Sequence, residues 1–386
     1  MDTLPILTSS QGHTLIARVA RFCQAHDLVH PGTRIIVGLS GGPDSVFLLH
    51  ALVALRDVQQ LTLIAAHLDH GWRTTSAEDV AFCATLTNQL NVPFVHEHAR
   101  NLAKMFNSTR HTTGSLEDQG RRMRRTFFER VQHEHQAGAI ALAHHQDDQH
   151  ETFFIRLTRG AGLAGLAGIR PKAKQYIHPL LCCTKREILD TLHEHALPYQ
   201  IDATNTDQKF LRNRIRTHLL PCLHNCDNRS QASLTRAIEQ LQETDAYLEQ
   251  ATEKLLESML VPANHTIGHT NPPKTAHPAP SHAIALPSPL ILSEVEGGAS
   301  SGCKLTKPKN LWICCATLCA QHPYMQKRLV LNWLIRAGVP FTPSEALLEE
   351  ILRFLRTDRG GTHSPAQTWH IIKKKCYAGI ALKSAP

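Results

Sequence analysis

The sequence lacks the cysteine pattern that usually holds a zinc ion or an iron–sulfur cluster. Its 11 cysteines form no Cys-x-x-Cys pair, and two of the closest pairs are directly adjacent residues. This irregular spacing is also unlike the disulfide framework of a small secreted protein. We therefore expect neither a structural metal cluster nor a set of stabilising disulfides.

Long apolar runs are missing as well. The longest one, residues 311–320, is too short for a helix that must cross a bilayer with about 20 residues. Residues 1–5 show no basic segment followed by an apolar core, so we expect no signal peptide. The sequence has no internal repeat. These absences predict a cytoplasmic protein that does not enter a membrane.

Acidic residues are in the minority. Lys and Arg total 41 against 33 Asp and Glu, which gives a net charge of +8 over 386 residues. A moderate basic excess suits a polyanionic partner but does not identify one. The 26 histidines are dispersed along the chain. The length allows two or three domains.

Apolar strand-like runs alternate with helical patterns in the first half of the chain. Strands are expected at residues 35–39, 61–66, 93–96 and 139–143, and helices at residues 46–55, 77–90 and 116–133. This alternation is typical of an α/β fold with a doubly wound parallel sheet and helices on both faces. In such a sheet, ligands bind beyond the carboxyl ends of the strands.

A glycine turn follows the first of these strands. Residues Ser40–Ser45 read Ser-Gly-Gly-Pro-Asp-Ser and lead directly into an apolar helix pattern. The two glycines allow several N–H groups to point at one spot, and the helix N-terminus behind them favours an anion. The Ser40 and Ser45 hydroxyls can donate to phosphate oxygens, and Asp44 can hold Mg²⁺ against them. No Gly-Lys-Ser/Thr follows, so the loop is not a Walker A motif. The alternative is an ordinary capped turn.

Two further polar segments follow predicted strands. His67–Arg73 comes after the second strand and His144–Thr152 after the fourth. Because the strands are parallel, both segments should share one sheet edge with the glycine turn. Asp148 and Glu151 are three residues apart and lie on one helix face. Carboxylates at a helix start also interact well with the helix dipole, which is the plainer interpretation.

Arginines recur on two predicted helices. Arg121 and Arg124 share one helix face, and Arg212, Arg214 and Arg216 follow a turn at residues 202–205. Either set could be a solvated basic face. Arginine is also suited to clamp phosphate, so we expect these side chains to face polyphosphate or an RNA backbone.

The second half changes character along its length. Residues 232–260 form a long amphipathic helix pattern, and residues 261–310 are rich in Pro, Ser, His and Gly. Helices at 325–337 and 344–355 and a β-hairpin at 368–372 and 377–382 are expected beyond them. We predict a catalytic domain at 1–225, a connecting helix at 226–260, a linker or insertion at 261–310, and a smaller, mostly helical domain at 311–386.

These segments, in this order, resemble the tRNA(Ile)-lysidine synthetases, which belong to the PP-loop ATP pyrophosphatases. The resemblance runs from Arg34 to Pro221 and depends on the following motifs: Ser40–Ser45, His67–Arg73, Glu117-x3-Arg121-x2-Arg124, Ala143–Thr152, Arg159–Leu166, Asp202-x2-Asn205 and Arg212–Arg216. Asp69, Trp72 and Arg125 depart from the family's usual residues. Residues 325–382 resemble its second, substrate-recognising domain. A third domain present in some members is not expected here.

The resemblance implies an ATP-dependent RNA ligase. The C2 oxygen of the wobble cytidine in a CAU anticodon attacks the α-phosphate of ATP, and free lysine then displaces AMP to give lysidine. The implied cofactors are ATP and Mg²⁺, and the implied partners are tRNA(Ile) and free L-lysine, with a homodimer left open.

The resemblance also implies roles for particular residues. ATP would be held by Ser40, Gly41, Gly42, Pro43, Asp44, Ser45 and His67, with Asp44 on the metal. The residues implied in catalysis are Asp44, Arg121, Asp148, Glu151 and Arg212, of which Asp148 and Glu151 would bind lysine. Those implied in tRNA binding are Arg124, Arg214, Arg216, Lys373, Lys374 and Lys375.

Three alternatives remain at this point. A thiolating PP-loop enzyme would act on tRNA too, but that chemistry typically uses a Cys-x-x-Cys pair, which is absent. An amidotransferase-like nucleotide synthetase has less need of the basic segments. A non-catalytic RNA-binding protein has no need of Asp44 and the carboxylates at 147–151.

Overall fold

The computed structural model describes residues 10–69, 71, 76–101, 116–200, 211–262, 311–339, 343–365 and 369–382. The chain divides into two compact units, Met1–Glu243 and Thr244–Pro386. No helix among these described residues is long and apolar enough to span a membrane. The predicted linker at 261–310, apart from residues 261 and 262, and the predicted turn at 202–205 lie outside the described residues, as do His70, Trp72 and Arg73.

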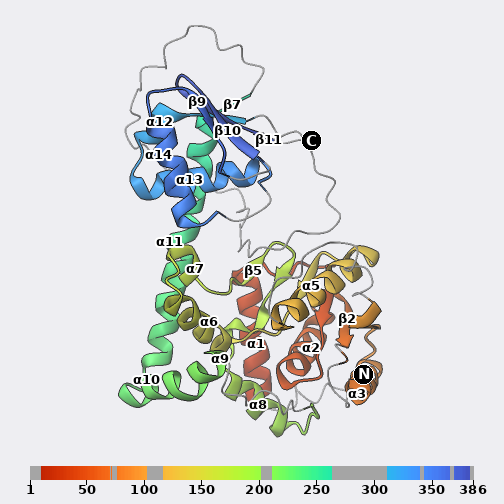
Figure 1. Ribbon diagram of the computed structural model, residues 1–386. Coiled ribbons are helices and arrows are strands. Elements are labelled where there is room, and N and C mark those ends of the chain that lie inside the picture. The colour runs from red at the N-terminus through yellow and green to blue at the C-terminus, as the bar shows by residue number, and fades with distance from the viewer. Residues whose placement is uncertain are drawn as a thin grey trace. The chain divides into compact units, whose positions relative to one another are not determined.

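The first unit is built on a six-stranded sheet with helices on both faces (Figure 1). The strands in spatial order are β3 (Phe94–His98), β2 (Thr62–Asp69), β1 (Arg34–Gly38), β4 (Ala139–Ala141), β6 (Tyr176–Ile177) and β5 (Lys172–Ala173). All neighbours are parallel except β5 and β6. The predicted parallel α/β sheet is thus confirmed.

Strand β1 explains why the sheet is covered on both faces. Ile35 and Val37 belong to one apolar cluster and Ile36 to another, and all three are fully buried. Because successive side chains of a strand point to opposite faces, an uninterrupted apolar strand needs a packed layer on each side.

Helices supply these two layers. The helices of the first unit are α1 (Ser10–Ala25), α2 (Pro43–Arg56), α3 (Ser76–Gln89), α5 (Leu116–Glu134), α6 (Gln146–Thr158), α7 (Leu163–Leu166), the 3₁₀ turn η2 (Pro179–Cys182), α8 (Lys185–Glu194), α9 (Leu211–Arg214), the π-helical η4 (Ile215–Leu219) and α10 (Leu220–Cys226). Helices α1, α2, α3 and α8 contribute to the cluster around Ile35, and α5 contributes Phe127 and Phe128 to the cluster around Ile36. The long helix α11 (Ser230–Met259) begins in this unit and ends in the second.

The second unit combines helices with an antiparallel sheet. Its strands in spatial order are β7 (Leu260–Pro262), β8 (Leu311–Cys314), β11 (Tyr377–Leu382), β10 (Trp369–Lys374) and β9 (Gly361–His363). Its helices are α12 (Cys315–Cys319), α13 (Pro323–Arg336) and α14 (Glu345–Arg356). The predicted hairpin is present as β10 and β11, but the sheet is larger than expected. The short strands β7 and β8 give no clear alternating pattern, so the sequence did not reveal them.

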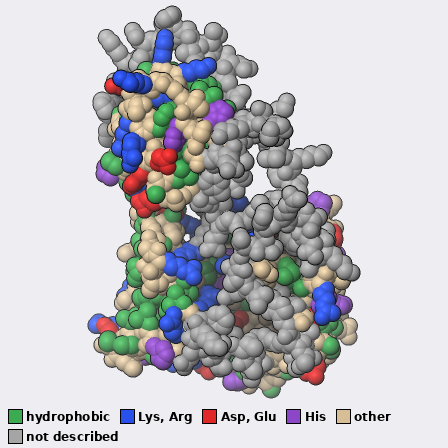
Figure 2. All heavy atoms as spheres, in the orientation of Figure 1, with side chains coloured by type: hydrophobic (Ala, Val, Ile, Leu, Met, Phe, Trp, Pro, Cys, Tyr) green, Lys and Arg blue, Asp and Glu red, His purple; other side chains and the backbone are tan. Residues whose placement is uncertain are grey.

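The basic run at residues 373–375 is only partly at the surface. Trp369, Ile371 and Lys373 alternate inward along β10, and the Lys373 ammonium donates hydrogen bonds to the backbone carbonyls of Leu355, at 2.6 Å, and Thr357. Lys374 and Lys375 are exposed, and Figure 2 shows several Lys and Arg side chains on the visible face of this unit. The ammonium of Lys373 thus has its partners inside the unit, which speaks against the predicted contact of this residue with tRNA and leaves Lys374 and Lys375 as the accessible charges.

Candidate active site

The glycine turn forms a tight loop between β1 and α2. Gly41 has a positive φ of 84°, a conformation that glycine adopts at little cost. Gly42 is the N-cap of α2, and Pro43 occupies the first helical turn, where its missing N–H leaves no bond unmade. The free N–H groups of the first turn of α2 therefore face the loop, as an anion site requires.

The two serines close this loop. The Ser45 hydroxyl donates to the Gly42 carbonyl at 2.9 Å and accepts from the Ser40 N–H at 3.1 Å. The two hydroxyl oxygens are 3.1 Å apart. The hydroxyls thus converge at the head of α2, where they can reorient toward phosphate oxygens.

His67 supports the loop from the neighbouring strand. Its Nδ1 lies 2.8 Å from the Leu39 carbonyl, directly before Ser40, and the residue is buried. Burial lowers the pKa of His67 even though the bond to Leu39 opposes this shift. A neutral His67 therefore joins β2 to the start of the loop.

Asp44 lies in the first turn of α2 and contacts two basic side chains, Lys185 and His145. The Lys185 ammonium lies 2.6 Å from Asp44 Oδ1, and His145 Nε2 lies 3.8 Å from the same oxygen. The Lys185 backbone N–H also donates to Asp147 Oδ2 at 2.7 Å. Lys185 was missed by the sequence analysis. The Thr184–Glu187 capping box predicts where α8 begins, but no local sequence pattern indicates that this helix packs beside Asp44.

His145 lies among three carboxylates at the start of α6. It is 3.5 Å from Asp147 and 3.4 Å from Asp148, in addition to Asp44. Burial alone would lower the pKa of His145, but these carboxylates outweigh burial and raise that pKa. Burial likewise opposes ionisation of Asp147, yet His145 and the Lys185 N–H lower the Asp147 pKa to about 2. Asp147 is therefore ionised at neutral pH, and the surrounding carboxylates favour the protonated form of His145.

Asp148 has a structural task as well. Its Oδ2 accepts the His145 backbone N–H at 3.0 Å, which completes the N-terminal capping of α6. Burial raises the pKa of Asp148, but His145, His144 and this hydrogen bond together bring it below the usual value. Asp148 therefore caps the helix, as the plainer interpretation has it. Its carboxylate also lies 3.4 Å from His145, which in turn lies 3.8 Å from Asp44.

Glu151 is fully buried and held by two arginines. Arg216 donates to both carboxylate oxygens at 2.6 and 3.1 Å, and Arg212 Nε lies 2.9 Å from Oε2. Burial raises the pKa of Glu151 although both arginines act against the shift. The π-helical turn η4 carries Arg216, and Arg214, which lies between the two arginines in sequence, is exposed. A lysine ammonium could bind Glu151 only in exchange for an arginine.

Helix α5 adds positive charge to the site. Arg121 and Arg124 are exposed on this helix. Burial, Arg212 and Arg121 together lower the pKa of His144 to about 4, with burial the largest cause, so Arg121 acts on the α6 start through space. The side chain of Glu117 lies outside the described residues.

The side chains at this site could hold a hard cation such as Mg²⁺ only if phosphate oxygens complete its coordination. No group of three or more His, Cys, Asp or Glu among the described residues is arranged to hold a metal. Mg²⁺ commonly takes one or two protein carboxylates and fills its remaining positions with phosphate oxygens and water. Asp44, at the head of the loop, meets that requirement.

Comparisons with known proteins agree with this geometry. A family model for the PP-loop domain matches residues 13–223. The chain is 38% identical over 254 residues to a tRNA(Ile)-lysidine synthase of Geobacter sulfurreducens, covering 64% of this chain and 52% of that protein. It is 34% identical over 286 residues to the tRNA(Ile)-lysidine synthase of Bacillus subtilis, covering 70% and 56%. A bifunctional protein TilS/HprT of Listeria innocua is 35% identical over 254 residues, covering 63% and 38%.

The chain therefore spans about two fifths to just over half of the length of these relatives. Among solved structures, a U34-tRNA thiolase of Methanococcus maripaludis superposes with a TM-score of 0.51 at 20% identity, covering 60% of this chain and 80% of that one. This likeness concerns the fold alone. Since the family model matches more than half of the chain, including the loop at 40–45 and the charged start of α6, the chain belongs to the PP-loop domain family.

Proposed function

We propose that this chain attaches free L-lysine to the wobble cytidine of a CAU-anticodon isoleucine tRNA at the expense of ATP. Relatives named tRNA(Ile)-lysidine synthase, 34–38% identical, support the substrate assignment. The observation that carries the chemistry is the charged cluster at the carboxyl edge of the sheet, where Asp44, Lys185 and the α6 carboxylates meet the phosphate-type loop. The proposal locates the chain in the cytoplasm, where tRNA and free lysine occur.

The first step forms a bond between the cytidine C2 oxygen and the α-phosphorus, and pyrophosphate leaves. The loop N–H groups of residues 41 and 42, together with the Ser40 and Ser45 hydroxyls, would hold the leaving phosphates. Mg²⁺ bound to Asp44 would supply charge neutralisation at those oxygens. Lys185 and Arg121 would stabilise the negative charge that develops on the phosphates.

The second step forms a bond between the lysine ε-nitrogen and C2, and AMP leaves with the former C2 oxygen. The ε-ammonium must lose one proton before its nitrogen can attack, and the nitrogen loses a second proton once the new bond has formed. Asp148, which contacts His145 as Asp44 does, would hold the ammonium. Glu151 would also bind the lysine ammonium. Arg212 and Arg216 would then release Glu151 and bind the phosphate of AMP or of RNA instead.

The test is mass spectrometry of the tRNA after incubation with the full chain, ATP and lysine. We expect the wobble nucleoside to gain one lysine and lose one water, with one AMP and one pyrophosphate released. A nucleoside that gains sulfur would instead favour the thiolation alternative. That outcome is disfavoured because the sequence has no Cys-x-x-Cys pair.

A further inference from the structure

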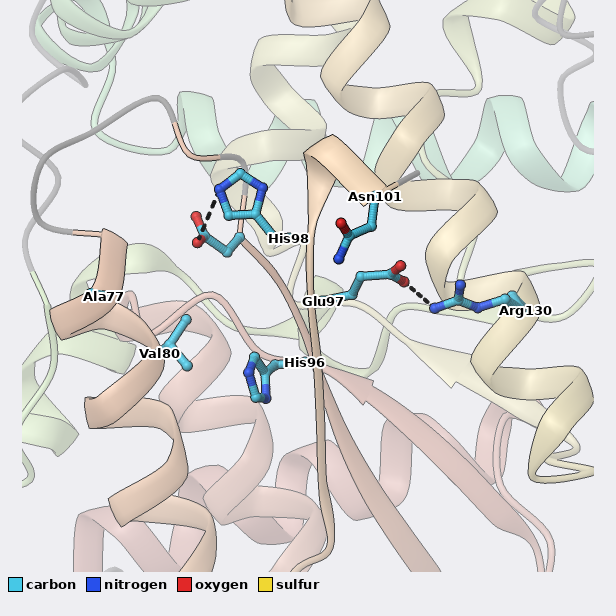
Figure 3. A pocket seen from close by; sticks show the side chains of 8 residues that line it. Ala77, Val80, His96, Glu97, His98, Asn101 and Arg130 are labelled. Carbon is cyan, nitrogen blue, oxygen red and sulfur yellow. Dashed lines mark hydrogen bonds and ion pairs between the residues drawn. The ribbon is translucent and has the colours of Figure 1, made fainter. Parts of the chain in front are cut away.

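A second polar cavity lies at the same sheet edge, at the ends of β2 and β3. It encloses about 610 Å³ and is lined by side chains from both strands and from α3 and α5. Figure 3 shows His96 and His98 on one side of β3, and Glu97, Asn101 and Arg130 on the other. None of these residues has a part in the chemistry proposed above.

Strand register locates this cavity relative to the glycine turn. His67 pairs with His96 and Asp69 with His98, while β2 pairs in turn with β1, which leads into Ser40. Neighbouring strands are about 4.8 Å apart. The cavity therefore begins at β2, roughly 5 Å from the strand that carries the loop, and extends along the carboxyl edge to β3, roughly 10 Å away, so a group adjacent to the reacting nucleotide could reach it.

The charges in the cavity disfavour a phosphate. Asp69 pairs with His98 at 3.8 Å, and Glu97 forms an ion pair with Arg130. Among the described lining residues, and leaving the two histidines aside, two carboxylates against one guanidinium give one net negative charge. A polyanionic phosphate would be repelled, whereas a neutral group with donors and acceptors would be accepted.

The uncharged lining suits a flat heteroaromatic ring. The His96 imidazole stacks on Phe94 with centroids 5.6 Å apart and planes at 14°, so the exposed imidazole and the ring beneath it form a two-ring platform. Unpaired RNA bases stack on such rings. The Asn101 side chain offers a donor and an acceptor together, the combination that reads a base edge.

Helix α5 connects this cavity with positive charge outside it. The helix contributes Arg130 to the cavity and carries exposed Arg121, Arg122, Arg124 and Arg125 about one and a half to two and a half turns away. Arginines that contact the RNA backbone would fix its position, while groups within the cavity would read a base.

We propose that this cavity receives one unstacked base of the RNA substrate, next to the nucleotide that reacts. The inference rests on the proposed function, because it needs an RNA loop that is opened at the sheet edge. It adds a specificity site that is separate from the ATP loop.

The test uses the full chain with Asn101→Ala and His96→Ala, and with Asn88→Ala and His133→Ala as controls on exposed positions of α3 and α5. The probes are a CAU anticodon stem-loop and a series of it in which one loop base at a time is removed. Dissociation constants are measured by fluorescence anisotropy at fixed salt, and the KM for ATP is measured by pyrophosphate release.

We expect each cavity variant to weaken binding of the intact stem-loop about tenfold, as loss of one stacked base does, and the controls to leave it unchanged. For one abasic probe, the cavity variants should bind as the wild type does, because the base they contact is already gone. Equal losses with every abasic probe would overturn the inference. So would a raised KM for ATP with unchanged RNA binding, which would assign the cavity to the adenine of ATP.

The outcome is separable from that of the proposed function. Wild-type protein that forms lysidine while its cavity variants bind every probe normally would refute the cavity alone. Wild-type protein that binds the stem-loop without adding lysine would refute the proposed chemistry, and the abasic series would still decide the cavity. If the wild type forms lysidine on the full tRNA but binds no stem-loop, the cavity proposal alone fails.

Discussion

Single residues at the sheet edge have more partners than their sequence context indicates. Asp44 contacts a lysine 141 residues away, and Glu151 contacts an arginine 65 residues away. Local spacing can reveal a loop or a helix face, but a long-range ion pair depends on how helices pack. The sequence therefore predicted Asp44, Asp148 and Glu151 as a group and missed Lys185.

Asp44→Asn tests the loop carboxylate. An amide is a much poorer ligand for Mg²⁺ and cannot pair with Lys185, so ATP-dependent pyrophosphate release should fall to background. Circular dichroism and the urea midpoint should stay close to wild type, since Asp44 is partly exposed. The control is Asp57→Asn at the other end of α2, where the side chain is exposed. Pyrophosphate release at the wild-type rate would show that Asp44 holds no metal.

Arg216→Ala separates two roles for one arginine. The sequence suggests contact with tRNA, whereas the structure pairs Arg216 with the buried Glu151. Loss of a partner for a buried carboxylate should cost about 1–3 kcal/mol in the free energy of unfolding. Urea unfolding measures this cost, with Arg214→Ala as the exposed neighbour control. Unchanged stability with weaker tRNA binding would instead favour the tRNA role.

At the scale of helices and strands, local patterns predicted most elements. The four strands expected in the first half all occur. Three of them are apolar and largely buried within the two-sided sheet, whereas the edge strand β3 is only partly buried. Strand β10 was expected to end at residue 372 but continues to Lys374. That extension of two residues keeps the period of two and turns Lys373 inward, which the run of three lysines in the sequence did not indicate.

A buried histidine in helix α2 predicts that the folded chain loses stability at acid pH. His50 is buried among its apolar residues, and neither ring nitrogen has a hydrogen-bond partner among the residues that the structure describes. Burial lowers its pKa from 6.5 to about 4. The unfolded chain then binds the extra proton first, so stability should fall as pH drops from 6.5 to about 4, by up to about 1.4 kcal/mol per pH unit.

His50→Leu should reduce this loss, because a leucine binds no proton in either state. The measurement is the free energy of unfolding in urea at several pH values between 4 and 7. The exposed His133→Leu serves as the control. If both variants keep the wild-type pH slope, His50 does not titrate on unfolding.

At the scale of the whole chain, the two units have separate hydrophobic cores. The first holds the loop and the charged cluster, and the second has its own core around Trp333 and Trp369. Ion pairs from Arg328 and Arg336 to acidic residues at 245, 249 and 253 attach α13 to the end of α11 within this second unit. The sequence indicated a second module, but not that the end of the long helix forms part of it.

Lys374→Ala combined with Lys375→Ala tests whether the second unit grips tRNA. Each phosphate contact releases counterions, so loss of two should reduce the slope of log affinity against log salt by up to about 2. Lys373→Ala is the informative comparison, because it should lower stability instead, through two carbonyls that lose their donor. An unchanged salt slope in the double variant would exclude these lysines from the tRNA contact.

The most direct test of the proposed function follows isotope-labelled lysine into tRNA. The full chain is incubated with CAU-anticodon tRNA, ATP and labelled lysine, and the nucleosides are analysed by mass spectrometry, with Asp44→Asn in parallel. The account predicts one labelled lysine per wobble cytidine, dependent on ATP and absent with the variant. Unlabelled wobble cytidine, from wild-type protein that binds both ATP and the tRNA, would contradict it.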